Sequence, residues 1–278
     1  MQQSYITVQG LKLAIYERHG KKPVLFFVHG NSSNAHAYDE AWSAEILRDY
    51  HLLSIDLPGH GSSEKSKDGS AYTITALSNI IAEIIDQKSL KEVILIGHSM
   101  GGNIATGVLH FTDKVVAVAL AGNVPLNNAG ELSKAYLISE TVQTVFKSSA
   151  TDDEIKAFSE VAVHQPMKRK VIVESYKQTD ERFREEMGLE LGRYFGSENF
   201  ISEVELIQKK KVALCLICGA YEKVINLNYV KGIQGLPLYN NKVQIIDNAG
   251  HCVPFESPQA FANILAGFAS HVAAKGLA

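Results

Sequence analysis

The stretch VILIGHSMGGN, residues 93–103, decides the fold of this chain. Its first four residues are apolar and mostly β-branched, which is typical of a buried strand, and the residues after the glycine-rich corner have helical spacing. Ser99 therefore stands at a tight turn between a strand and a helix, and Gly97 and Gly101 leave room for that turn. Such a turn strains the serine backbone and lifts the hydroxyl out of the sheet edge. The Met100 amide and the N-terminus of the following helix would face a negative charge that forms beside the Ser99 hydroxyl. The stretch therefore predicts a nucleophile next to an oxyanion site.

Length and composition limit what the chain can be. It has 278 residues, of which 46% are hydrophobic and 21% charged, and a formal net charge of -3. The length is typical of one globular core with an insertion, and the composition is that of an ordinary globular protein. The negative net charge gives no indication of a basic surface that would bind nucleic acid. No apolar run approaches ~20 residues, and the first ten residues lack a cationic start with an apolar core. We therefore expect a cytoplasmic protein with no nucleic-acid or membrane partner, and leave monomer and dimer both open.

Three cysteines include the pair Cys215 and Cys218, whose spacing is found in redox and metal sites. Both lie in an apolar run of strand type, where residues three apart point to opposite faces. They cannot converge on one ion, so we expect buried, reduced thiols and no metal site.

The strand and helix patterns alternate along most of the chain. This alternation predicts a mostly parallel eight-stranded sheet with helices on both faces. The expected strands are residues 4–9, 11–17, 24–28, 51–55, 93–96, 115–121, 212–218 and 243–247. The expected helices outside the insertion follow the elbow or cover residues 35–47, 72–87 and 257–272.

After the sixth strand the alternation stops, and residues 126–208 are mostly helical in pattern. We expect four helices there, at 135–146, 152–163, 168–178 and 180–191. The core is then made of residues 1–125 and 209–278. An insertion that returns to the same sheet must lie over its carboxyl edge, where Ser99 projects, so we interpret it as a helical cap. The alternative is a separate interaction domain.

A serine hydroxyl needs a base, and the base needs an acid that holds its tautomer. His251 follows the last strand in a glycine-containing loop and is the candidate base. Glu222 lies in the loop after the penultimate strand and is the candidate acid. Asp247 is its rival, but it sits too close along the chain to reach His251 from behind, so we favour Glu222.

The loop HGNSS, residues 29–33, follows a buried strand. Here Asn31 would donate a second backbone amide to the oxyanion, beside Met100. The alternative is a polar loop that only caps the next helix. In the glycine- and proline-rich loop 56–63, we expect Asp56 and His60 to shape the loop and not to take part in chemistry.

With these motifs, the chain resembles α/β-hydrolase fold enzymes over nearly its whole length. The motifs are HGNSS at 29–33, DLPGHG at 56–61, GHSMGG at 97–102 and DNAGH at 247–251. The first and last, taken with Glu222, are most similar to the α/β-hydrolase N-acyl homoserine lactonases. That resemblance implies a Ser-Glu-His triad that opens a lactone without a metal or other cofactor.

The resemblance also implies Gly30, His98 and Phe158 as substrate contacts. Two of these positions depart from the lactonases. Phe158 stands where they carry a tyrosine that helps to hold the substrate, and His98 stands where an indole is expected.

Our leading hypothesis is a serine hydrolase of a carboxylic ester or lactone, with an N-acyl homoserine lactone as substrate. The alternatives within enzymes are a broad carboxylesterase and a carbon–carbon bond hydrolase. Dehalogenases and epoxide hydrolases of this fold use aspartate at the elbow, where this chain has Ser99. The alternative outside enzymes is a small-molecule receptor that keeps the triad but turns over slowly.

Overall fold

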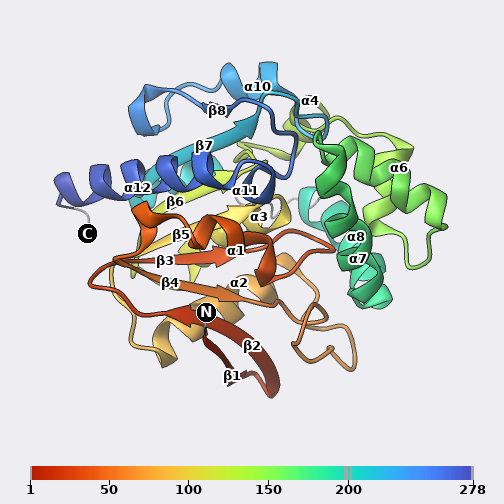
Figure 1. The fold of residues 1–278 in the computed structure, drawn as a ribbon, viewed down its shortest axis with the longest axis horizontal. Helices are drawn as coiled ribbons and strands as arrows, with labels where there is room; N and C mark the ends of the chain where they lie inside the picture. Colours follow the sequence, from red (N-terminus) through yellow and green to blue (C-terminus); the bar gives the residue numbers. More distant parts are fainter. Residues whose placement is uncertain (1, 197–199, 201, 277–278) are drawn as a thin grey trace.

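The computed structural model describes residues 2–196, 200 and 202–276. In that part of the chain, eight strands form one sheet in the order β1-β2-β4-β3-β5-β6-β7-β8 (Figure 1). The strands are β1 (Gln2–Val8), β2 (Leu11–Arg18), β3 (Lys22–Val28), β4 (Tyr50–Ile55), β5 (Val93–His98), β6 (Val115–Ala121), β7 (Ala213–Gly219) and β8 (Gln244–Ile246). The α/β-hydrolase fold expected from the sequence is confirmed, and each expected strand is present.

The sheet is antiparallel only at its first edge. Strand β1 pairs with β2 and β2 with β4 in antiparallel register, whereas β4, β3, β5, β6, β7 and β8 are parallel. Strand β5 lies between β3 and β6, and all six of its residues are buried. Because helices cover both faces, the strand is continuously apolar from Val93 to Ile96 and does not alternate with polar residues.

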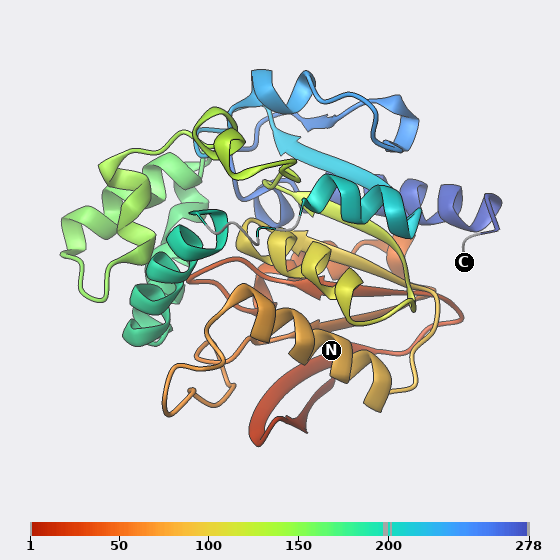
Figure 2. The same cartoon turned by 180° about the vertical axis from the view of Figure 1, so that it is seen from behind.

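Helices form a layer on each face of the sheet. On the face toward the viewer in Figure 1 lie α1 (Asp39–Trp42) and α12 (Pro258–Ala274). Figure 2 shows the other face, covered by α2 (Ile74–Gln87), α3 (Met100–Gly107) and α9 (Glu203–Lys210). Each layer has its own apolar core against the sheet. Cys215 packs in one core and Cys218 in the other, and both thiols are free and buried, as predicted.

The cap occupies the segment between β6 and β7 (Figure 1). Its helices are α4 (Leu132–Ala135), α5 (Glu140–Gln143), α6 (Asp152–Ala162), α7 (Arg169–Gln178) and α8 (Glu181–Gly196). Helix α6 begins with a complete capping box between Thr151 and Glu154. The cap lies beyond the carboxyl ends of the parallel strands, and the chain then returns through α9 to the sheet.

Two segments that we expected to be single helices are divided into shorter elements, so these two predictions are wrong. Residues 35–47 form only short turns, η1 (Ala35–Tyr38), α1 and η2 (Glu45–Leu47), because the backbone of Ala44 is extended. Residues 135–146 are interrupted at Tyr136, whose extended backbone forms a β-bridge with Ile225. At Tyr136, pairing with a loop of the core prevents the helix that the sequence pattern favours. Helix α5 begins only at Glu140, where the Ser139 side chain caps its N-terminus.

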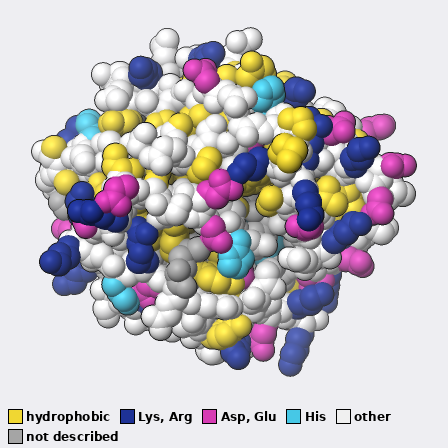
Figure 3. All heavy atoms as spheres, in the orientation of Figure 1, with side chains coloured by type: hydrophobic (Ala, Val, Ile, Leu, Met, Phe, Trp, Pro, Cys, Tyr) yellow, Lys and Arg dark blue, Asp and Glu magenta, His cyan; other side chains and the backbone are white. Residues whose placement is uncertain are grey.

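Surface charges are mixed in sign. On the face seen in Figure 3, basic and acidic side chains are interspersed over the cap and the core. None of the helices in the described residues is long and apolar enough to span a membrane.

Candidate active site

The elbow places Ser99 between β5 and α3. Its backbone has a φ of 52° and a ψ of -127°, a strained conformation for a residue with a side chain. A Cβ at Gly97 would lie 2.3 Å from the Gly101 carbonyl oxygen, and a Cβ at Gly101 would lie 2.2 Å from the Val28 oxygen. Only glycine fits at these two close approaches, so the elbow geometry expected from the sequence is confirmed.

The structure brings His251 and Glu222 together. His251 Nδ1 lies 2.9 Å from Glu222 Oε2, and both side chains are almost fully buried. The other carboxylate oxygen, Oε1, accepts hydrogen bonds from the Val224 and Ile225 amides at 2.7 and 3.2 Å. Asp247, the rival acid, is exposed. The geometry therefore favours Glu222 as the group that orients the imidazole.

Ser99 and His251 line the same cavity, and no hydrogen bond joins Ser99 Oγ to His251 Nε2 in this structure. Catalytic hydrogen bonds of this kind are often long without substrate and tighten when substrate binds. The imidazole has room only because residue 122 is glycine. A Cβ at Gly122, where φ is +56°, would lie 3.0 Å from the Cε1 and Nδ1 atoms of His251.

His98 supports the loop that carries His251, the candidate base. Its Nε2 donates to the His251 carbonyl oxygen at 3.0 Å. Burial, together with the neighbouring His251, lowers the pKa of His98 to about 3. The His98 imidazole is therefore neutral, and its N–H group is already bonded to the His251 carbonyl oxygen. It can line the cavity and hold the loop, but it cannot supply a positive charge in addition to that of His251.

Asn31 and Met100, the expected oxyanion residues, both line the cavity beside Ser99. The Asn31 side chain is fixed on both sides, because its Nδ2 donates to the Val145 oxygen at 3.1 Å and its Oδ1 accepts from Ser32 at 3.0 Å. Gly30 brings this loop against the elbow, since a Cβ there would lie 3.0 Å from the Ser99 Cβ. The sequence-predicted residues of the two loops thus meet at one place.

The neighbouring loop 56–63 is held as expected. The Asp56 carboxylate accepts from the Ala35 amide, the Ser62 amide and the Tyr16 hydroxyl at 2.8 to 3.0 Å. Its role in shaping the loop is confirmed. His60 is buried, and its ring packs edge-to-face on Phe183 of the cap.

The cavity at Ser99 has a volume of about 660 Å³ and a mostly apolar wall. The cap supplies most of this wall, chiefly through Val145, Phe146, Phe158, Ile172, Leu191 and Phe195. Phe158, on α6, is buried and lines the cavity as expected. A cleft of this size with a few polar groups beside a serine is typical of a site for a small amphiphilic molecule.

A buried polar network behind Ser99 was not found from the sequence. Asn123 Nδ2 donates to the Ser99 oxygen at 3.0 Å, to Asn103 Oδ1 at 2.9 Å and to the Tyr136 hydroxyl at 3.3 Å. Asn103 in turn donates to Glu203 at 2.9 Å, and burial raises the pKa of Glu203 to about 7. These side chains come from α3, the loop after β6, the cap and α9, so no local sequence motif indicates the network.

The loop that carries His251 is also held to the cap by hydrogen bonds. The His251 amide donates to the Ala162 oxygen at 3.0 Å, at the end of α6. Glu256 is buried and accepts from the Gly250 amide at 2.9 Å and from the Gln165 amide at 3.0 Å. The only sign of this clamp in the sequence is a glutamate shortly after the expected base.

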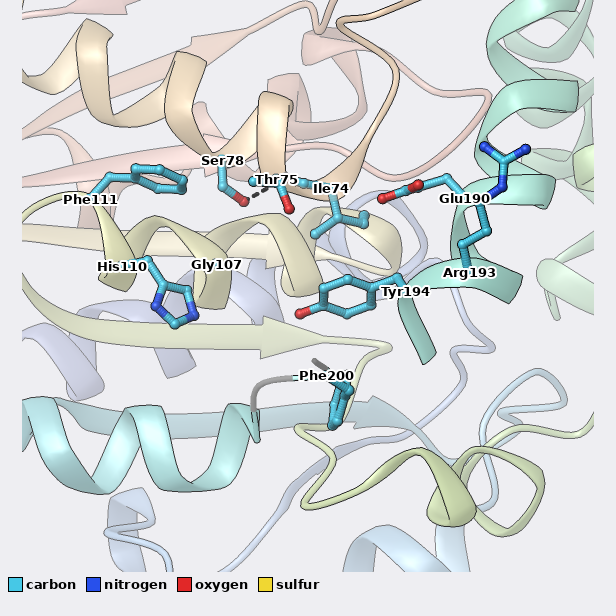
Figure 4. Close-up of a pocket in the computed structure, with 10 residues that line it drawn as sticks. All are labelled: Ile74, Thr75, Ser78, Gly107, His110, Phe111, Glu190, Arg193, Tyr194 and Phe200. Atoms are coloured by element: carbon cyan, nitrogen blue, oxygen red, sulfur yellow. Dashed lines mark hydrogen bonds between the residues drawn. The ribbon is translucent and has the colours of Figure 1, made fainter. Parts of the chain in front are cut away.

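A second cavity, of about 510 Å³, lies between α2, α3 with the turn η3 (Val108–His110) that follows it, and α8 (Figure 4). It contains the hydroxyl of Ser78, which donates to the Ile74 oxygen at 2.8 Å and to the Ile104 oxygen at 3.0 Å. These bonds use the hydroxyl to join two helices, so Ser78 does not resemble an activated nucleophile.

Among the described residues, one group has metal-ligand chemistry: Glu17, His19 and His51, whose ligand atoms lie within 4.8 Å of one another. His51 lies at the amino end of β4, at the opposite edge of the sheet from Ser99. The Lys88 ammonium already contacts Glu17 at 2.8 Å, and His51 does so at 2.7 Å. These contacts explain the cluster as an ion-pair network.

A serine hydroxyl next to an imidazole that contacts a carboxylate is an arrangement typical of acyl transfer. Comparisons with known proteins agree with this chemistry. The sequence model of the alpha/beta hydrolase fold matches residues 23–258.

Two curated relatives match most of the chain. A Bacillus subtilis protein, provisionally named 2-succinyl-6-hydroxy-2,4-cyclohexadiene-1-carboxylate synthase, is 27% identical over 82% of this chain and 84% of its own length. A Mycoplasma genitalium protein, provisionally named esterase/lipase 2, is 24% identical over 87% of both chains.

Among solved structures, the chain is similar to the S102G mutant of N-acyl homoserine lactonase AidH in complex with N-hexanoyl homoserine lactone. The TM-score is 0.87 and the sequence identity 21%, over 96% of this chain and 97% of that one.

The room that Gly122 leaves for the imidazole gives a first prediction. In the variant Gly122→Ala the new methyl group displaces His251, so we expect a fluorophosphonate to label Ser99 at least about tenfold more slowly. The matched control is Gly235→Ala, which has a φ of +76° but no atom within 4 Å of the added Cβ. It should lose about 1 kcal/mol of stability in thermal melts from backbone strain and label at the wild-type rate. Equal labelling by the two variants would contradict this role of Gly122.

Proposed function

Because this chain belongs to the α/β-hydrolase fold family, we propose that it is a metal-free serine hydrolase that cleaves a carboxylic ester or lactone through an acyl-enzyme. The leading substrate is an N-acyl homoserine lactone. The chain is an α/β hydrolase, and relatives with esterase and lactonase names support an ester or lactone as substrate.

In the proposed reaction, Ser99 Oγ attacks the carbonyl carbon while His251 Nε2 takes the hydroxyl proton. The tetrahedral intermediate collapses, the carbon–oxygen bond of the ester breaks, and His251 returns its proton to the departing oxygen. Water then repeats the sequence on the acyl-enzyme and releases the acid. For a lactone, the leaving alcohol stays attached to the acyl group, so the product is a hydroxy acid.

Glu222 orients His251 and stabilises its cation, which the 2.9 Å contact and the two backbone amides on the other carboxylate oxygen support. The Asn31 and Met100 amides bind the oxyanion. Serine, imidazole and amides together supply the nucleophile, the base and the charge stabilisation, so this mechanism requires no metal.

One observation carries the choice of substrate: the apolar cavity of about 660 Å³ that opens directly onto Ser99. It can hold an acyl tail while the polar end of the substrate stays at the elbow. In this pose Gly30 and His98 contact the reacting group, and Phe158 forms part of the wall along the tail.

A broad carboxylesterase is the second candidate. The side chains of Ile138 and Leu189 are about half exposed and also line the cavity, so its mouth is open and apolar. An open apolar mouth admits many esters.

A substrate panel with wild type and Ser99→Ala tests the proposal. We expect N-acyl homoserine lactones to be hydrolysed with a higher kcat/KM than p-nitrophenyl esters and a vinylogous diketone. Ser99→Ala should lower kcat by about 10³- to 10⁶-fold, because the triad acts as a unit. A folded Ser99→Ala that keeps most of the activity would contradict the serine mechanism. Faster turnover of plain esters would favour a carboxylesterase, and faster cleavage of the diketone would favour a carbon–carbon bond hydrolase. Binding without steady-state turnover would favour a receptor.

Two amide substitutions separate the candidate acids. Glu222→Gln keeps the shape of the side chain but favours the wrong imidazole tautomer, so we expect kcat to fall by about 10²- to 10⁴-fold, as in the serine protease triad. Asp247→Asn changes an exposed residue and should leave kcat within about twofold. Steady-state kinetics on one ester measures kcat for both variants. A larger loss for Asp247→Asn than for Glu222→Gln would assign the orienting role to Asp247.

The apolar wall predicts a dependence on acyl chain length. Each buried methylene contributes about 0.8 kcal/mol, so two further carbons should raise kcat/KM roughly tenfold until the cavity is full. Phe158→Ala should move the preferred chain to greater length and Phe158→Trp to shorter length. The control is Met167→Ala, which removes an exposed cap side chain outside the cavity and should keep the wild-type profile. A flat profile for wild type would show that the wall does not bind the tail.

A further inference from the structure

Tyr136 lines the cavity at Ser99, and its hydroxyl is not used by the proposed mechanism. It accepts a hydrogen bond from Asn123 Nδ2 at 3.3 Å, and the same nitrogen donates to the Ser99 oxygen at 3.0 Å. One amide group therefore ties the hydroxyl to the backbone of the nucleophile.

The Tyr136 proton is free to bind a ligand. An asparagine amide has two hydrogens, and Asn123 shares them among three acceptors, of which Tyr136 is the most distant. Within the described residues, the Tyr136 hydroxyl donates to no protein acceptor. Burial raises the pKa of Tyr136, so the group keeps its proton at every pH at which the enzyme would be assayed. Tyrosine hydroxyls that are shielded from water usually make hydrogen bonds, and a substrate in the cavity that Tyr136 lines can accept this proton.

The backbone on both sides of Tyr136 is fixed. The Leu137 amide donates to the Val224 oxygen and the Asn226 amide to the Ala135 oxygen, each at 2.8 Å. This pairing fastens Tyr136 to the loop that carries Glu222, so the hydroxyl keeps its position relative to the triad. A donor fixed before binding loses little entropy when a ligand arrives.

Two other polar side chains near Ser99, Asn31 and His98, already have a donor in use. The Asn31 amide donates to the Val145 oxygen, and His98 Nε2 donates to the His251 oxygen. In the proposed function the oxyanion is bound by the backbone amides of Asn31 and Met100. In this arrangement an oxygen that accepts from Tyr136 is a second oxygen of the substrate, distinct from the oxyanion.

We propose that Tyr136 is a specificity-determining residue that donates a hydrogen bond to a second carbonyl oxygen of the substrate, next to the reacting ester. The substrate class is then an ester or lactone with an acylamino group on its α-carbon. This inference rests on the proposed function and adds to it the group that selects for the amide. The cavity wall is otherwise mostly apolar, so an amide carbonyl without this bond would be left without a partner.

The test compares Tyr136→Phe with wild type on two lactones of equal length. N-hexanoyl homoserine lactone carries the amide, and α-heptyl-γ-butyrolactone lacks it. We expect Tyr136→Phe to lower kcat/KM about 3- to 10-fold on the first lactone, chiefly through KM, and less than about twofold on the second. Equal losses on both lactones overturn the proposal, because a structural defect would not depend on the amide.

The matched control is Tyr176→Phe. The Tyr176 hydroxyl donates to the Thr144 and Lys147 oxygens at 3.0 Å within the cap and does not line the cavity, so its loss should affect both lactones equally. If wild type hydrolyses esters but not lactones, the same comparison uses N-hexanoylglycine p-nitrophenyl ester and p-nitrophenyl nonanoate. A selective loss on the amide-bearing ester then supports Tyr136, although the lactone assignment has failed. If wild type hydrolyses none of the four compounds, the proposed function and this inference are both overturned.

Discussion

The close approach of the first turn of α3 to the ends of β3 and β5 is the constraint on which the site depends. Gly97 and Gly101 allow backbone contacts that any Cβ would block, and Ser99 adopts a positive φ between them. Such a conformation costs about 1 to 3 kcal/mol and persists only where the surroundings determine it fully. Here they do, because β5 is buried between β3 and β6 and cannot shift to relieve the strain.

The cap is a structural part of the site as well as its cover. Each of the three loops around Ser99 forms hydrogen bonds with a different cap segment: Asn31 with Val145, the loop after Glu222 with the backbone beside Tyr136, and His251 with Ala162. A change in cap packing therefore affects the loops that carry Asn31, Glu222 and His251 together. The loops around Ser99 and the cap wall of the cavity are thus coupled through hydrogen bonds, two of these contacts between backbone groups and one from the Asn31 side chain.

The sequence predicted the core well because its signals are local. The apolar runs of β5 and β7 and the glycines around Ser99 specify their surroundings within a few residues, and they sufficed for the fold and for the candidate triad. The cap was predicted less well. The break at Tyr136 results from pairing with Ile225, a residue about ninety positions away, and helical periodicity carries no information about it. The same limit explains why Asn123, Tyr136 and Glu256 were missed: their roles depend on partners from distant segments.

These contacts also bear on how a substrate reaches Ser99. Opening the cap as one body would break the hydrogen bonds to all three site loops, and it would expose Glu256 and Gln165, whose contacts join the cap to the loop that carries His251. Movement at the mouth costs much less, because the Ile138 and Leu189 side chains there are already about half exposed. The smaller free-energy cost favours a cap that stays docked while side chains at the mouth admit the substrate. A docked cap also keeps Tyr136 and Phe158 in place before binding, which is the condition for either residue to discriminate between substrates.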